Sequence, residues 1–417
     1  MKNKIKFSRH ERGQALIIIT FAIIGLIGLT GLTVDGGMAY SDRRKAQNTA
    51  DSAAFAAALA HVRGEDLEPT AKSIATTNGY DDNKLSNTVT VTSEPSPVDA
   101  CPSGTSDNLD ITVEIVSHIK TSFATIVGIH QMTNTVSATT RACGQYIAPI
   151  FGGNAIVSLN PGPDCAFDSG DSNAVHWDVS GGGIFSNGCA FSKDEDAVTL
   201  DPDQCVATVG DATGGLVGDA CTGEPAPYDA EYIASIMPPN PCTGALANGT
   251  YAGGGKVATE RQTTFLNGVY CMDTEDKMNA LSQEDVILSN ATLYVTANQF
   301  DVRFSGGGGF SGTPTISGEY SSYYIIVADN GHPCTTFTGN GTNKQVLEYR
   351  GNGSGTLYGT ILAPSACIDF RGNGTGEVNS QLIGYTVTSN GSSVITLNYV
   401  DDQNHRDPVD PALQLLK

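Results

Sequence analysis

The chain is poor in tryptophan and in positive charge, and it lacks common signatures of catalysis. One Trp occurs in 417 residues, and 44 acidic residues outnumber 23 basic ones, which gives a net charge of −21. Such a surface repels polyanions, so nucleic acid is excluded as a partner. The seven His are dispersed without an HExxH pattern, and no glycine-rich loop leads through a Lys into a helix. We therefore expect neither a zinc-protease site nor a phosphate-binding loop.

Cysteine is absent from the first hundred residues, and all ten Cys lie beyond them. None forms the C-x₂-C pair that is typical of zinc sites. An even number in one part of a chain is typical of disulfides formed in an oxidising compartment. Pairing neighbours in chain order is the simplest hypothesis, and it predicts five local bridges: Cys101–Cys143, Cys165–Cys189, Cys205–Cys221, Cys242–Cys271 and Cys334–Cys367.

Residues 15–34 contain no charge and are dominated by Ile, Leu, Ala and Gly. As a helix, this run is long enough to cross the roughly 30 Å hydrocarbon core of a membrane, so we expect contact with lipid. Residues 1–14 form a basic tail, which the positive-inside rule places in the cytoplasm, with the bulk of the chain outside. A cleaved signal peptide is the alternative, but its apolar region would be shorter and would end at a better cleavage site than residues 36–39.

The helix is expected to continue past the membrane, because residues 40–62 are rich in Ala and contain no Pro. Apolar alternation and helix-ending signals then indicate a small α+β domain, so that residues 35–147 form one domain on the projecting helix. Its predicted elements are a helix over 65–78, strands over 88–92 and 110–116, a short helix over 121–129 and a closing strand over 133–142.

The N-terminal region resembles a known family over residues 9–62, and more loosely to about residue 145. The matching residues are Arg12, Gly13, Asp35, Gly36, Tyr40, Arg43, Arg44, Gln47, Asn48, Ala50, Asp51 and Ala53 to Ala57. They resemble the TadE/TadG-like proteins of bacterial tight-adherence (Flp) pilus assembly. The resemblance implies a pilin-like, single-pass protein of the bacterial cytoplasmic membrane, with its bulk extracytoplasmic and with other pilus-assembly or pilin-like proteins as partners.

One position departs from the pattern of related prepilins. Processing by prepilin peptidase follows a Gly that has a Glu five residues later, whereas Ile18 stands five residues after Gly13. The sequence therefore does not predict cleavage after Gly13.

Residues 148–400 are rich in Gly, Asn, Ser and Thr and contain an internal repeat. Residues 346–357 align with residues 367–378 at an offset of 21, and a further Gly-Asn-Gly occurs at 339–341. A short period made of strands and turns predicts a parallel β-helix, that is, a β-solenoid, with a β-sandwich as the alternative fold. Residues 401–417 are polar, contain two Pro and are predicted to be a loosely held C-terminal tail.

Alternation within the repeat predicts which side chains are inside. Leu347, Tyr349, Ile368 and Phe370 share one face and should stack in the interior. Glu348, Arg350, Asp369 and Arg371 occupy the other face, where they should form an outward ladder of opposite charges. An enzyme acting on polysaccharide could use the same four side chains in a groove, but mutual neutralisation explains them without catalysis.

An acidic loop holds the candidate metal ligands Asp194, Asp196, Asp201 and Asp203, whose oxygens would suit extracellular calcium. The spacing does not fit an EF-hand, and a solvated acidic loop is the preferred interpretation of the cluster. No other cofactor is expected.

The sequence thus predicts a membrane-anchored extracytoplasmic protein with a structural or binding role in pilus assembly, adhesion or the cell envelope, with surface glycans as candidate ligands. The alternative is a membrane-tethered β-helix enzyme that acts on polysaccharide.

Overall fold

The computed structural model describes residues 11–162, 164–170, 175–223, 225–282, 284–304, 310–334, 344–351, 357–372, 375–392 and 394–416. The Gly-Asn-Gly at 339–341, residues 352–356 and 373–374 of the 21-residue repeat, and residues 1–10 of the basic tail lie outside them. The chain divides into unit 1, Met1–Ile147 with Pro408–Lys417, and unit 2, Ala148–Asp407.

Unit 1 is built on α1 (Glu11–Val62), a helix of 52 residues. The predicted helix therefore continues without a break from the apolar run into the Ala-rich segment, as expected for a stretch that contains no Pro. After α2 (Leu67–Thr77) follow β1 (Asn87–Pro95), β2 (Leu109–Lys120), the 3₁₀ turn η1 (Ala124–Val127) and β3 (Gln131–Cys143). These elements correspond to the sequence prediction, with a 3₁₀ turn where a short helix was expected.

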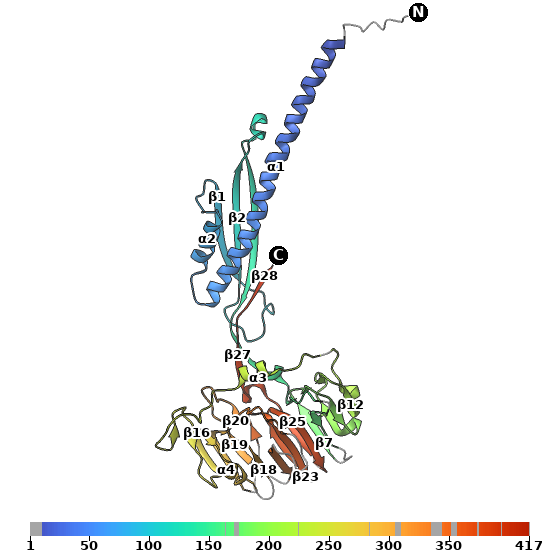
Figure 1. The fold of residues 1–417 in the computed structure, drawn as a ribbon, viewed down its shortest axis with the longest axis vertical. Helices are drawn as coiled ribbons and strands as arrows, with labels where there is room; N and C mark the ends of the chain where they lie inside the picture. Colours follow the sequence, from blue (N-terminus) through green and yellow to red (C-terminus); the bar gives the residue numbers. More distant parts are fainter. Residues whose placement is uncertain are drawn as a thin grey trace, which may run out of the picture. The chain divides into compact units, whose positions relative to one another are not determined.

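The C-terminal half of α1 packs along the antiparallel sheet (Figure 1). Its contact face is made of small residues three or four positions apart, which lie on one side of a helix. On β2, Ile111, Val113 and Ile115 alternate toward the helix and are fully buried. The helix residues that are fully buried in this core are Ala46, Ala50, Ala53, Ala54, Ala57 and Ala58.

The C-terminal segment is not the loose tail that the sequence predicts. β28 (Ala412–Leu416) pairs antiparallel with β3, and the sheet has the order β1-β2-β3-β28. Leu413 packs against the core of unit 1, so the prediction underestimated the apolar residues of this short segment. The chain leaves unit 1 through β4 (Tyr146–Pro149) and returns to it from unit 2 through β27 (Arg406–Val409).

Unit 2 is made mainly of short parallel strands. One sheet has the order β10-β7-β26-β24-β22. Its strands are β7 (His176–Ser180), β10 (Val198–Leu200), β22 (Leu357–Tyr358), β24 (Thr375–Asn379) and β26 (Val394–Asn398).

The second sheet of unit 2 holds seventeen strands among the described residues. They are β5 (Ile156–Ser158), β6 (Phe167–Asp168), β8 (Ile184–Ser186), β9 (Ala190–Ser192), β11 (Val206–Thr208), β12 (Ala212–Gly214), β13 (Leu246–Ala247), β14 (Thr250–Tyr251), β15 (Lys256–Val257), β16 (Thr264–Met272), β17 (Val286–Val295), β18 (Phe300–Phe304), β19 (Phe310–Thr313), β20 (Tyr323–Val327), β21 (Gln345–Gly351), β23 (Thr360–Gly372) and β25 (Leu382–Gly391). The short helical segments of the unit are η2 (Ile150–Gly153), η3 (Glu195–Ala197), η4 (Gly215–Asp219), α3 (Ala230–Ile236), α4 (Glu275–Asn279) and η5 (Asp401–Gln403).

Strands distant in sequence are neighbours in this sheet. β25 pairs with β23 on one side and with β5 on the other, and β5 pairs in turn with β8. All these pairings are parallel. The first strand of the unit, β5, therefore lies beside one of its last strands, β25, an order that the sequence does not reveal.

The two copies of the repeat lie next to each other. β21 and β23 pair in parallel, and the partners Leu347↔Ile368 and Tyr349↔Phe370 are those that the 21-residue offset predicts. These four side chains are at most 9% exposed. The rings of Tyr349 and Phe370 stack with centroids 5.0 Å apart, and Phe370 also meets Trp177 edge-on at 5.1 Å.

Candidate functional site

The N-terminal half of α1 presents large apolar side chains that stay mostly exposed in the described structure. Its large apolar residues between Leu16 and Val34 are each 41–75% exposed. This helix is long and apolar enough to cross a membrane. The threonine hydroxyls of the apolar run are satisfied within the helix, because those of Thr20, Thr30 and Thr33 donate to carbonyls four residues earlier, at 2.8 Å. A continuous exposed apolar surface of this kind requires apolar surroundings.

Asp35 is the first charged residue after the apolar run, and it holds the turn between β2 and β3. Its carboxylate accepts hydrogen bonds from the backbone N–H groups of Ser122 at 2.9 Å, Phe123 at 3.0 Å and Ala124 at 2.6 Å. These three amides belong to the first residue of η1 and to the two residues before it, so Asp35 supplies from another element the acceptor that a turn of helix needs at its N-terminus. The residue is 2% exposed. Asp35 therefore fixes the tip of the β2–β3 hairpin, which we define as residues 121–130, against α1.

Gly31, one helical turn before Asp35, lets the hairpin tip approach the helix closely. A Cβ at this position would lie 2.6 Å from Cβ of Phe123, whereas a Cβ at Gly28 would meet nothing within 4 Å. Beside this contact, α1 and the hairpin tip enclose a groove of about 540 Å³. Its lining residues are apolar apart from Asp35: Ile24, Ile27, Gly28, Gly31, Leu32, Asp35, Gly36, Phe123, Ala124, Ile126, Ile129 and Met132.

A second carboxylate joins α1 to the sheet further along. Asp42 accepts hydrogen bonds from the Tyr80 hydroxyl at 3.1 Å, from Nδ2 of Asn134 at 2.9 Å and from the Ser117 hydroxyl. Burial, together with the charge of Asp42, raises the pKa of Tyr80, so the phenol remains a hydrogen-bond donor. Asp35 and Asp42 thus fix the register of the helix on the sheet.

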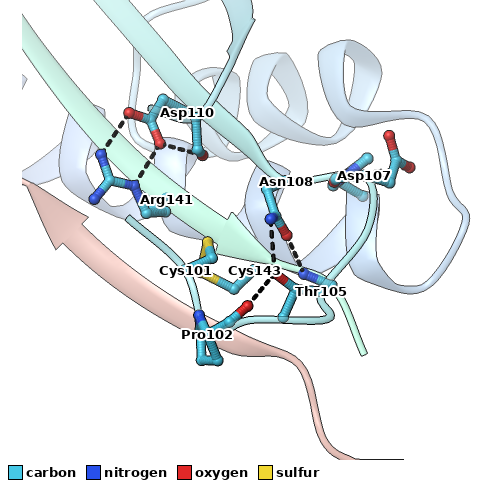
Figure 2. Close-up of a disulfide and its surroundings, with 11 residues drawn as sticks. Cys101, Pro102, Thr105, Asp107, Asn108, Asp110, Arg141 and Cys143 are labelled. Atoms are coloured by element: carbon cyan, nitrogen blue, oxygen red, sulfur yellow. Dashed lines mark hydrogen bonds and ion pairs between the residues drawn. A yellow bond between two sulfur atoms is a disulfide. The ribbon is translucent and has the colours of Figure 1, made fainter. Parts of the chain in front are cut away.

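At the other end of the sheet, a disulfide closes the β1–β2 loop. Cys101 in this loop is bonded to Cys143 at the end of β3 (Figure 2). Nearby, Arg141 donates from Nε and Nη2 to the two carboxylate oxygens of Asp110, both at 2.8 Å. Arg141 lowers the pKa of the Asp110 carboxyl, and it outweighs partial burial, which raises it. This end of unit 1 is therefore covalently and electrostatically locked.

The other cysteines also pair in chain order, as the sequence predicts: Cys165–Cys189, Cys205–Cys221, Cys242–Cys271 and Cys334–Cys367. The Cα atoms of all five pairs are 4.3–5.8 Å apart, as disulfides require.

The charges of the repeat are paired as predicted, but the carboxylates are not on the surface. Glu348 is 4% and Asp369 1% exposed, whereas the arginine side chains that cover them are partly exposed. Glu348 pairs with Arg350 and with Arg303, the latter at 3.5 Å. The prediction of an outward ladder is wrong for the carboxylates, because the folded-back arginines exclude water from them.

Asp369 pairs with Arg371 and accepts a hydrogen bond from the Thr388 hydroxyl at 3.1 Å. Burial raises the pKa of Asp369 despite the arginine, and nearby Glu348 adds to the rise. Glu348 and Asp369 each have an arginine partner, so the four charged side chains of the repeat form an ion-pair cluster with a structural role.

The candidate calcium ligands are spread over several local contacts. The Asp196 carbonyl accepts from Nδ1 of His176 at 2.5 Å, and the Asp201 carboxylate accepts from Gly181 N–H at 2.7 Å. Within the described part of the chain, no group of three or more His, Cys, Asp or Glu is placed to hold a metal ion. The structure therefore does not bring Asp194, Asp196, Asp201 and Asp203 together as a site.

Comparison with known protein families finds a match in the N-terminal part of unit 1. Residues 13–60 match a protein family described as "Putative Flp pilus-assembly TadE/G-like". The chain carries a TadE/G-like domain. The domain comprises most of α1, including the apolar run and the two carboxylates that dock the helix. No curated protein and no solved structure matches the chain.

Sequence reasoning identified Asp35 as one of the residues of the TadE/G-like pattern but missed what it binds. Its three donors are backbone amides 87–89 residues away, and backbone groups leave no trace in side-chain patterns. The only local signal is a lone charge that immediately follows a long apolar run.

Proposed function

We propose that this protein is a membrane-anchored, extracytoplasmic component of Flp-type pilus assembly, with its N-terminus in the cytoplasm. The observation that carries the proposal is the exposed apolar half of α1, which is continuous with a folded domain and lies within the TadE/G-like match. The basic residues before the apolar run support this orientation. Five disulfides after it support an oxidising compartment for the rest of the chain.

We further propose that unit 2 is a parallel β-solenoid with a structural or binding role. The parallel pairing of β21 with β23 and of β23 with β25, each shifted by about one repeat, supports this architecture. Buried apolar side chains stack from strand to strand, which is how a solenoid fills its interior. Such a body is suited to contact with pilus proteins or other envelope components, and the pairing of Glu348 and Asp369 with arginines favours this role over polysaccharide cleavage.

The proposal is tested in the producing bacterium. A strain that lacks the protein is complemented with the full chain, or with a chain in which residues 1–34 are replaced by a cleavable signal peptide. We expect the full chain to restore surface pili, counted by electron microscopy, and the released form to fail although it is exported and oxidised. Pili of normal number with the released form, or without any form of the protein, would refute the proposed role.

Protease accessibility tests the orientation separately. In spheroplasts, protease should digest unit 2, whereas an epitope placed at the N-terminus should be protected until the membrane is permeabilised. Protection of unit 2 in intact spheroplasts would show that the orientation is inverted.

A further inference from the structure

The hairpin tip lies beside the outer half of the apolar run of α1. The groove between them reaches from Asp35 back to Ile24. The eleven helical steps from Ile24 to Asp35 span about 16 Å, which is comparable to the roughly 15 Å half-thickness of a hydrocarbon core. If residues 15–34 cross the membrane, as the proposed function requires, the groove and the hairpin tip lie at the depth of one leaflet.

The side chains at the hairpin tip suit that depth. Ile126 is 79%, Ile129 50% and Phe123 38% exposed, and all three line the groove. Exposed apolar side chains that continue the apolar surface of a membrane span have lipid as their natural surroundings.

The backbone at the hairpin tip is also prepared for an apolar environment, in which an unpaired N–H would be costly. Asp35 accepts from the amides of residues 122, 123 and 124. Three further amides are bonded inside the tip: Ile126 N–H to Phe123 O, Gly128 N–H to Thr125 O and Ile129 N–H to Ala124 O.

The two threonine hydroxyls at the hairpin tip also have partners inside it. The Thr121 hydroxyl donates to the Ile129 carbonyl, and the Thr125 hydroxyl donates to the Thr121 carbonyl at 3.0 Å. Because these polar groups already have partners inside the turn, moving the turn from water into lipid breaks few hydrogen bonds to water and costs little free energy.

We propose that the hairpin tip, residues 121–130, inserts into the outer leaflet beside the span, and that the groove between them holds a lipid acyl chain. Unit 1 then has two membrane contacts, the span and the hairpin tip, which Asp35 joins at the membrane surface. This inference rests on the proposed membrane anchoring, and its test separates the two.

Tryptophan quenching by brominated lipid tests the insertion. Ile126→Trp places a reporter at the hairpin tip of the full chain. Val98→Trp is the matched control, because Val98 is 90% exposed in the β1–β2 loop, at the opposite end of the sheet. Both proteins are reconstituted into phosphatidylcholine vesicles with or without bromine on the acyl chains. The parent protein, whose sole Trp is Trp177, supplies the background signal to subtract.

We expect brominated vesicles to remove most of the emission that Ile126→Trp adds and to leave that of Val98→Trp unchanged. Ile129→Trp, at a half-exposed position on the same tip, should repeat the result if Ile126→Trp alters the fold by circular dichroism. Equal emission in both lipids, from a chain that floats with the vesicles, would overturn the insertion and leave the anchor intact.

Two other outcomes would also overturn the insertion of the hairpin tip or the assignment of lipid to the groove. Emission that shifts to the blue without bromine quenching, and only at high protein-to-lipid ratio, would mean that a second copy of the chain fills the groove and would overturn the lipid assignment. A chain that does not float with the vesicles would overturn the anchor and the hairpin-tip insertion together.

Discussion

Phe370 is the residue at which the interior of unit 2 can be tested most directly. It is 5% exposed, it stacks on Tyr349 at 5.0 Å with an interplanar angle of 18°, and it meets Trp177 at 5.1 Å and 75°. Replacing a buried Phe by Ala costs about 3–5 kcal/mol of unfolding free energy. Its two ring contacts contribute about 0.5–1.5 kcal/mol each within that total. We therefore expect Phe370→Ala to lose about 3–5 kcal/mol, and Phe370→Leu, which keeps most of the apolar volume, to lose about 1–3 kcal/mol.

The assay is denaturant unfolding of the full chain in detergent, followed by Trp177 fluorescence, because the sole Trp lies in the same core as Phe370. Leu266→Ala is the control, since Leu266 is 52% exposed on β16, and it should change the free energy by less than about 0.5 kcal/mol. The same loss for Phe370→Ala as for Leu266→Ala would show that the stacked interior has been assigned to the wrong face.

Further outcomes concern the buried carboxylates and one disulfide. Because burial raises the pKa of Asp369 in the folded state, the stability it contributes is present at low pH and is lost as the pH rises through that pKa. The melting temperature of Asp369→Asn should therefore exceed that of the parent protein at about pH 7, and the excess should be smaller at about pH 4. An excess that is the same at both pH values would contradict this. Replacing Cys101 and Cys143 by Ala, which opens a loop of 42 residues, should cost unit 1 about 4 kcal/mol by circular dichroism, and a loss below about 1 kcal/mol would refute the contribution. Asp35→Asn should speed hydrogen exchange at the three amides of the hairpin tip that Asp35 accepts from, whereas Asp51→Asn should not, and equal exchange in both variants would mean that Asp35 does not hold the tip.

Much of unit 1 could be predicted from sequence because its signals are local. An uncharged run of residues 15–34 and an Ala-rich continuation without Pro fix α1, and alternation fixes β2 and β3. The repeat predicted the register of Tyr349 on Phe370 because corresponding positions of successive copies lie side by side in parallel strands.

The remaining features depend on contacts between distant segments. Asp35 binds backbone amides, which have no side-chain signature. Glu348 alternates like a surface residue, yet arginines from two strands close over it. The place of β5 beside β25 depends on the path of the whole unit, which no local pattern encodes.

The pairing of β28 with β3 delays completion of the unit 1 sheet during synthesis of the chain. β3 ends at Cys143 and β28 begins at Ala412, so 268 residues (144–411) lie between the two strands along the chain. At about 5–20 residues per second, a ribosome needs roughly 15–50 s to make that stretch. Throughout this time β3 has an unpaired edge, and such edges accept strands from other chains. The four-stranded sheet of unit 1 can therefore be completed only after the whole of unit 2 has been synthesised.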